Sequence, residues 1–120
     1  MFGHKKTRNL TPREVHDSLQ AGRIVLIDVR EPGEYESERI HGALLFPLST
    51  FDAAALPDPD DKQLVFQCGS GKRSAMAVDR CRKAGLDVDA HLAGGIMAWK
   101  QAGLPTVTLD AATGRVRDVR

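Results

Sequence analysis

The chain has 120 residues, of which 42% are hydrophobic and 28% charged, and its formal net charge is +1. This length predicts a single domain that buries a core without disulfides or structural metals, and the near-neutral charge excludes a general attraction to nucleic acid or to membranes. Aromatic residues make up 5% of the chain, too few for a platform that stacks the bases of single-stranded nucleic acid.

The sequence also bears on location and on metal binding. No apolar run is long enough to span a bilayer, and the N-terminus lacks the apolar segment of a secretory signal, so we expect a cytoplasmic protein with reduced thiols. We expect no disulfide between Cys68 and Cys81, because a helical Cys81 would lie roughly 10 Å along its helix and a bridge needs Cα atoms within about 7 Å. No Cys/His cluster has ligand spacing, so we expect neither a metal nor a cofactor.

The first third of the chain has clear start signals. Residues 1–8 are polar and are predicted to be a flexible N-terminal segment. After a short strand at residues 9–10, a helix begins with a capping signal: Thr11 caps it, Pro12 suits its first position and Glu14 completes a capping box.

The apolar, β-branched run at residues 24–29 predicts a central strand of a parallel sheet. Asp28 and Arg30 stand at its carboxyl end, where ligands of α/β folds bind. We interpret them as a structural ion pair that holds the next loop, with a supporting role for Arg30 in the site as the alternative. Residues 34–39 are predicted to form a short helix and residues 43–46 a third strand.

The middle of the chain continues the alternation of strand and helix. Residues 49–56 are predicted to hold a short helix and residues 57–61 an acidic surface loop. The apolar run at residues 64–66 predicts a buried strand, and residues 74–81 a helix. Helical spacing turns Cys81 toward the core, so we expect it to be inert.

Toward the C-terminus, residues 88–92 are predicted to form the last strand, with His91 as a packing or edge residue. Residues 94–95 turn into a helix on which Trp99 is a core anchor. Residues 106–120 form either a hairpin or a linker, and the sequence does not choose between them.

The stretch that carries chemistry joins the strand at residues 64–66 to the helix that follows it. It consists of Cys68, Gly69, Ser70, Gly71, Lys72, Arg73 and Ser74. A glycine-rich turn of this kind points backbone N–H groups inward as an anion-binding nest, and the helix N-terminus adds partial positive charge. Lys72 and Arg73 add two full charges. Cysteines in such sites have pKa values of roughly 3.5–7.5 instead of ~8.5, so Cys68 is predicted to be a nucleophilic thiolate. The alternative is a small buried hydrophobe.

This stretch resembles the active-site loop of rhodanese-type sulfurtransferases, C-x-x-G-x-R-S. Other segments resemble the family's signatures in its order and spacing: Ile27–Glu31 with Glu34–Tyr35, then Ile40–Ala43, then Leu92–Trp99 with Gly103–Pro105. The resemblance runs from about residue 10 to residue 105. The family usually has His-Ile-Pro-Gly-Ala where this chain has Arg39-Ile40-His41-Gly42-Ala43, so we do not carry over substrate contacts there and interpret His41 as a solvated loop residue.

The resemblance implies a rhodanese-like three-layer α/β/α fold with a five-stranded parallel sheet in the order 3-2-4-5-1, which the alternation of strands and helices accommodates. It places a rhodanese-like domain at residues 9–105, between the N-terminal segment at residues 1–8 and a tail of unknown role at residues 106–120.

The resemblance also implies a two-step covalent reaction. The Cys68 thiolate attacks the outer sulfur of a donor such as thiosulfate, sulfite leaves, and cyanide or a thiol then takes the sulfur from the Cys68 persulfide. Loop N–H groups stabilise the negative charge, Lys72 and Arg73 attract the anionic donor, Gly71 permits a backbone conformation that a Cβ would oppose, and Ser74 caps the helix or donates a hydrogen bond. The partners are thus a small sulfur donor and acceptor, with a thiol-containing protein as an alternative acceptor.

Other readings of the same stretch remain open. Its Cys-Gly-Ser-Gly start is similar to the mercaptopyruvate branch, but the two basic residues favour a doubly charged inorganic donor. A cysteine phosphatase or arsenate reductase is less favoured, because tyrosine-phosphatase loops place one more residue between the cysteine and the arginine. The chain could instead be a binding or regulatory module, although such modules usually lack the cysteine, or a persulfide carrier that feeds a protein partner.

Overall fold

A five-stranded sheet forms the centre of the molecule. The structure is a computed structural model that describes residues 6–119. The sheet has the order β1-β6-β5-β2-β4, and its pairings are parallel. In chain order its strands are β1 (Arg8–Leu10), β2 (Ile24–Asp28), β4 (Leu44–Leu45), β5 (Gln63–Gln67) and β6 (Ala90–Leu92). Numbered within the sheet, the strands lie 3-2-4-5-1, which confirms the predicted topology.

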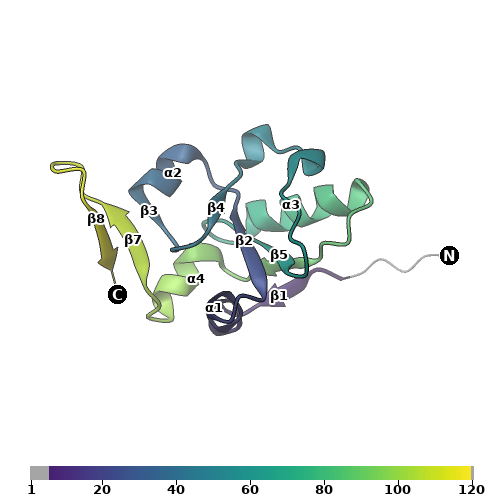
Figure 1. Ribbon diagram of the computed structural model, residues 1–120, viewed down its shortest axis with the longest axis horizontal. Coiled ribbons are helices and arrows are strands. Elements are labelled where there is room, and N and C mark those ends of the chain that lie inside the picture. The colour runs from purple at the N-terminus through teal and green to yellow at the C-terminus, as the bar shows by residue number, and fades with distance from the viewer. Residues whose placement is uncertain (1–5, 120) are drawn as a thin grey trace.

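Helices cover both faces of this sheet (Figure 1). One hydrophobic cluster joins the sheet to α1 (Pro12–Gln20) and α4 (Gly95–Gln101). The other joins it to α3 (Lys72–Lys83) and to the 3₁₀ turns η1 (Leu48–Thr50) and η2 (Ala53–Ala55). Strand side chains alternate between the clusters: on β2, Leu26 belongs to the first and Ile27 to the second. Because both faces of the central strand β2 are buried, its residues 24–27 are all apolar, as the sequence predicts.

Helix α1 begins where its capping signal predicts. The Thr11 hydroxyl accepts the Glu14 N–H at 3.1 Å, and the Glu14 carboxylate accepts the Thr11 N–H at 2.9 Å. A cap of this kind contributes about 1 kcal/mol. It also turns the chain from β1 into α1 at one residue, which brings Val15 into the core with no exposed surface.

Several predicted elements differ from the observed ones. The helix expected at residues 34–39 is α2 (Pro32–Ser37), and the single helix expected at residues 49–56 is two 3₁₀ turns. Helix α2 ends early because Glu38 has an extended backbone, with φ −159° and ψ 137°, and opens β3 (Glu38–Arg39). Strand β6 is the last of the parallel sheet but not the last of the chain.

Residues 106–119 form a hairpin, which was one of the two predicted alternatives. Strand β7 (Thr106–Leu109) pairs antiparallel with β3 and with β8 (Val116–Val119), so the three strands make a second sheet. The Glu38 carboxylate accepts hydrogen bonds from Lys100 at 2.7 Å and from Thr106 at 2.6 Å, and these bonds connect the hairpin to α4. Figure 1 shows the hairpin at one end of the molecule, whose extents are 55 × 28 × 26 Å.

The structure does not test where the predicted N-terminal segment, domain and C-terminal tail begin and end. Residues 1–5 of the expected N-terminal segment lie outside the described residues, and Arg8 already belongs to β1, so the limits 1–8, 9–105 and 106–120 stay a prediction. None of the helices in the described part of the chain is long and apolar enough to cross a membrane. Among residues 6–119 no group of three or more histidine, cysteine and acidic side chains is placed to hold a metal ion.

Candidate active site

Cys68 directly follows β5 at the carboxyl edge of the parallel sheet, and it is completely buried. The chain then turns through Gly69 and Ser70 into α3, which begins at Lys72 and not at Ser74 as predicted. The reason is Gly71, which caps the helix with φ 104°, a left-handed conformation that favours glycine. The helix therefore starts two residues earlier, and its first N–H groups lie closer to the cysteine.

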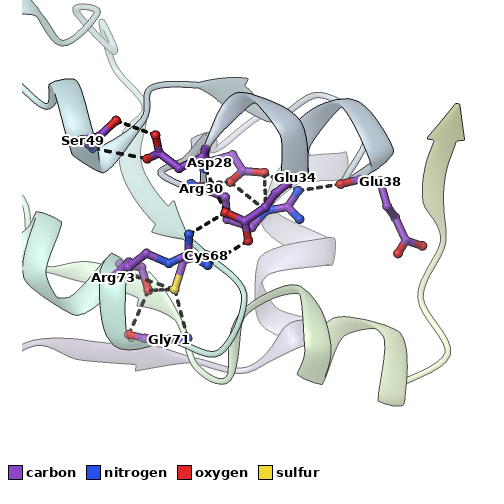
Figure 2. Close-up of polar contacts among 10 residues, drawn as sticks. Asp28, Arg30, Glu34, Glu38, Ser49, Cys68, Gly71 and Arg73 are labelled. Carbon is purple, nitrogen blue, oxygen red and sulfur yellow. Dashed lines mark hydrogen bonds and ion pairs between the residues drawn. The ribbon is translucent and has the colours of Figure 1, made fainter.

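The sulfur of Cys68 lies within a set of backbone donors. Its Sγ atom accepts the Gly71 N–H at 3.1 Å (Figure 2) and the Ser74 N–H at 3.3 Å. Burial raises the pKa of Cys68, but hydrogen bonds from Ser74, Gly71 and Ser70 together outweigh burial and leave the pKa below its ordinary value. This is the direction that the sequence predicts, and it arises from hydrogen bonds to the charged form.

Helix α4 holds the loop from its other side. The N–H of Ile96 donates to the Cys68 carbonyl at 2.8 Å, and the N–H of Met97 donates to the Gly69 carbonyl at 3.1 Å. This close approach requires a glycine at position 95, because a Cβ there would lie 2.6 Å from the Gly69 carbonyl. Sequence reasoning identified the turn at residues 94–95 but not its contact with the cysteine loop.

Arg73 does not offer the uncompensated positive charge that the sequence predicts. Its Nη1 and Nη2 atoms donate to the two carboxylate oxygens of Glu34, at 2.6 and 3.0 Å (Figure 2). The hydrogen bond from Arg73 lowers the pKa of Glu34 to about 2, so the pair is ionised at neutral pH. Lys72, the other predicted cation, is exposed on the first turn of α3.

Glu34 is therefore a candidate site residue that sequence reasoning missed. It stands 39 positions before Arg73, on α2, and no local pattern connects the two. The one available signal was the Glu34–Tyr35 signature, which the sequence identifies without a role.

The Asp28–Arg30 pair has the geometry of a structural ion pair. Arg30 is 5% exposed and Asp28 is fully buried, and their closest N···O distance is 2.9 Å. Arg30 also donates to the Glu38 carbonyl at 2.6 Å, which fixes the turn from α2 into β3. Asp28 is the register partner of Gln67, one residue before the cysteine, so the pair also supports the position of the loop.

His91 is the second site residue that sequence reasoning missed. It lies in β6 between β1 and β5, so it is not at a sheet edge, and it is 5% exposed. Its Nδ1 atom lies 2.7 Å from the Ser74 hydroxyl and its Nε2 atom 2.7 Å from the Asn9 side-chain oxygen. The signal that could have found it is the parallel register, which pairs Asn9 with His91.

The second cysteine lies apart from this chemistry. Cys81 is fully buried in the cluster on the α3 face, and both cysteines are free thiols. Burial alone raises the pKa of Cys81 to about 11. The predicted core position of Cys81 is confirmed.

Comparisons with known proteins place this geometry in a family. A sequence model of the rhodanese-like domain matches residues 11–102. The chain is 40% identical over 112 residues to an uncharacterised protein of Synechocystis, covering 92% of this chain and 63% of that protein. It is 39% identical over 107 residues to the probable adenylyltransferase/sulfurtransferase MoeZ of Mycobacterium tuberculosis, covering 87% of this chain and 27% of MoeZ.

A solved structure agrees with the sequence comparisons. The thiosulfate sulfurtransferase of Pseudomonas aeruginosa superposes with a TM-score of 0.71 at 28% identity, over 83% of this chain and 20% of that one. The chain thus spans less than two thirds of the curated relatives named above. The cysteine loop, the strand order and the matched residues together show that this chain belongs to the rhodanese-like domain family.

Proposed function

We propose that this chain is a sulfurtransferase in which Cys68 carries the sulfur as a persulfide. The observation that carries this proposal is the position of Sγ, which accepts the N–H groups of Gly71 and Ser74 at the start of α3. These backbone donors stabilise negative charge on the cysteine side chain. The names of MoeZ and of the Pseudomonas enzyme include the same reaction class.

The reaction proceeds by two displacements at sulfur. The Cys68 thiolate attacks the outer sulfur of the donor, a new S–S bond forms, and the S–S bond of the donor breaks with its electron pair leaving on sulfite. An acceptor thiolate or cyanide then attacks the outer persulfide sulfur, and the Cys68 thiolate returns. Because Cys68 has no exposed surface, the loop at residues 69–73 has to move to admit the donor.

We propose thiosulfate, or a donor of similar charge, as the substrate. Lys72 is exposed beside the loop, and Arg73 can exchange its Glu34 carboxylate for an incoming anion. The Glu34 carboxylate nevertheless offsets one of the two predicted charges, so the preference over the singly charged mercaptopyruvate is smaller than the sequence suggests. The length of the loop argues against a phosphatase, because only four residues separate Cys68 from Arg73.

A protein acceptor is the second candidate, and we propose it on a surface observation. Met97 is 57% exposed on the first turn of α4, and its N–H donates to the Gly69 carbonyl of the loop. Met76 is 50% exposed on α3, four residues after Lys72. Exposed methionines are common on surfaces that bind protein partners. Met76 and Met97 lie near the N-termini of α3 and α4, the two helices that contact the loop.

The decisive experiment is intact mass before and after incubation with thiosulfate, and again after cyanide. We expect a gain of one sulfur atom that cyanide removes, and that is absent in a folded Cys68→Ser variant. Cys81→Ser serves as the matched control, and it should gain the sulfur as the unmodified chain does. A protein that gains no sulfur from thiosulfate or mercaptopyruvate, but gains it from a persulfidated protein, would be a partner-fed carrier. A protein that gains none from any donor would be a binding module.

A further inference from the structure

A series of hydrogen bonds, buried as far as His91, leads away from Cys68, and the transfer steps above do not use it. The Sγ atom of Cys68 lies 3.6 Å from the Ser74 hydroxyl oxygen, which lies 2.7 Å from Nδ1 of His91. Beyond the ring, Nε2 of His91 lies 2.7 Å from Oδ1 of Asn9. These hydrogen bonds thus connect the end of β5 to the first turn of α3, then to β6, and then to the edge strand β1.

The partners decide where the protons are. The side-chain oxygen of Asn9 accepts, so Nε2 of His91 carries a proton and Nδ1 of the neutral ring is an acceptor. The Ser74 hydroxyl has two acceptors in reach, the Gly71 carbonyl at 3.1 Å and Nδ1 of His91 at 2.7 Å. The Gly71 carbonyl already accepts the Ala75 N–H at 3.2 Å, so the hydroxyl donates its single proton to the nearer Nδ1 and presents a lone pair to Cys68. In this state the thiol S–H has an acceptor, and the ring has a partner at each nitrogen.

The same geometry also satisfies a second protonation state. If the Cys68 S–H bond breaks and its proton moves to the Ser74 oxygen, the original Ser74 proton moves to Nδ1 of His91. The thiolate then accepts the Ser74 O–H in addition to the N–H groups of Gly71 and Ser74, and the imidazolium donates to Ser74 and Asn9. The transfer leaves the net charge of the buried site unchanged, so it avoids the cost of an isolated buried ion.

We propose that His91 is a positioning residue that accepts the proton of Cys68 through the Ser74 hydroxyl, and that Asn9 holds the ring in the accepting tautomer. The groups that face the ring are Asn9 from β1, Ser74 from α3 and, beyond Ser74, Cys68 from the end of β5. Of these three, Cys68 alone titrates. Burial lowers the pKa of His91, so the ring is neutral while Cys68 is a thiol, and the imidazolium forms only together with the thiolate charge that offsets it. The proposal rests on the proposed function only in taking Cys68 as the nucleophile.

The variants are chosen to distinguish a His91 that accepts a proton from a His91 that only holds its neighbours in place by hydrogen bonds. The amide of His91→Gln can donate to Asn9 and accept from Ser74, but it cannot take a proton. Asn9 is exposed on an edge strand, so Asn9→Asp places a carboxylate beside the ring at little cost and stabilises the imidazolium. The matched control is His41→Gln, which changes an exposed loop histidine.

The experiment follows the ultraviolet absorbance of the thiolate against pH in the full chain, with Cys68→Ser as the baseline, and the rate of alkylation by iodoacetamide. We expect His91→Gln to lower the thiolate fraction and the alkylation rate at neutral pH by about tenfold. The deficit should disappear at alkaline pH, where the thiol ionises without help. Asn9→Asp should move both curves to lower pH, and His41→Gln should move neither.

Two results would overturn the proposal: a folded His91→Gln with an unchanged thiolate curve, or a loss of alkylation that is equal at every pH. If His91→Gln does not fold, Asn9→Asp becomes the test. A thiolate absorbance curve of Asn9→Asp that does not move to lower pH would then reject the proton transfer from Cys68 to His91. Neither readout needs a sulfur donor. If the variants shift the thiolate curves but the protein accepts no sulfur, the proton transfer to His91 stands and the proposed function is rejected. If the curves are unchanged but the protein transfers sulfur, the proposed function stands and the proton transfer to His91 is rejected.

Discussion

Replacing Glu34 by glutamine should strengthen the interaction with an anionic donor. The carboxylate of Glu34 accepts hydrogen bonds from both terminal nitrogens of Arg73, at 2.6 and 3.0 Å, so it offsets the positive charge of Arg73 beside the loop. In Glu34→Gln the guanidinium keeps its place through a neutral amide but is no longer compensated. We therefore expect KM for thiosulfate to fall, although the substitution removes an ion pair.

The magnitude follows from the exposure of the pair. The pKa of Glu34 is lowered from 4.5 to about 2, but the two side chains are 33% and 39% exposed, so solvent screens most of that interaction and the pair is worth about 1 kcal/mol. An uncompensated charge at a partly exposed site likewise contributes about 1 kcal/mol to a nearby anion, which is roughly fivefold in KM. We expect Glu34→Gln to be less stable by about 1 kcal/mol and to have an approximately fivefold lower KM for thiosulfate.

The stability that the Glu34–Arg73 ion pair contributes depends on pH. The pKa of Glu34 is lower in the folded protein than in the unfolded chain, so the stability from the ion pair is fully present above about pH 4.5 and is lost as the pH falls toward 2. The stability difference between the unmodified chain and Glu34→Gln should therefore be constant at neutral pH and shrink below about pH 4.5.

The assay is steady-state sulfur transfer with thiosulfate and, in parallel, with a neutral persulfide donor, together with urea unfolding. Glu36→Gln is the matched control, because it removes an exposed carboxylate from the same helix. A higher KM for thiosulfate in Glu34→Gln, or equal changes for the charged and the neutral donor, would refute the electrostatic reasoning and assign Glu34 a positioning role instead.

Two further substitutions test the contact between α4 and the loop and the role of the second cysteine. Gly95→Ala should lower sulfur transfer by about a hundredfold, because its Cβ pushes the Gly69 carbonyl out of place. Gly22→Ala, which has a similar positive φ but open space around it, should lose only about 1 kcal/mol of stability and keep its activity; equal losses of activity would mean that strain, not the contact, is responsible. Cys81→Ala should cost about 1 kcal/mol through a small cavity and leave the persulfide yield unchanged, and a folded variant that gains no sulfur would show that this thiol takes part.

The strand order was predicted from the family resemblance, whereas the elements that the residues themselves predicted are those whose causes are local. The capping box at Thr11 lies within four residues, and the apolar run of β2 needs only its own composition to indicate a strand buried on both faces. The start of α3 was misplaced because it depends on the left-handed backbone of Gly71. The composition of the loop permits that conformation without requiring it.

The candidate site residues were missed for a different reason, because their partners are far away in the sequence. Glu34 and Arg73 are 39 positions apart, and Asn9 and His91 are 82 positions apart. Asn9 and His91 meet because β1 and β6 pair in register, and Glu34 meets Arg73 because α2 and α3 follow the neighbouring strands β2 and β5. The sequence therefore indicated the residues of the loop itself but not its partners, and it overestimated the charge at the site because Lys72 and Arg73 were counted without Glu34.

This correction changes what stabilises the candidate thiolate. With Arg73 paired to Glu34, the negative charge on Cys68 is stabilised mainly by the N–H groups of Gly71 and Ser74 and by the Ser74 hydroxyl. Backbone N–H groups are fixed in place and act only at hydrogen-bond range, whereas a free guanidinium would attract any anion near the loop. If the proposed reaction holds, such a site stabilises the thiolate before and after transfer and leaves donor selection to the Glu34–Arg73 pair beside the loop. Changing that pair should then alter which donor is used more than how fast bound sulfur is passed on.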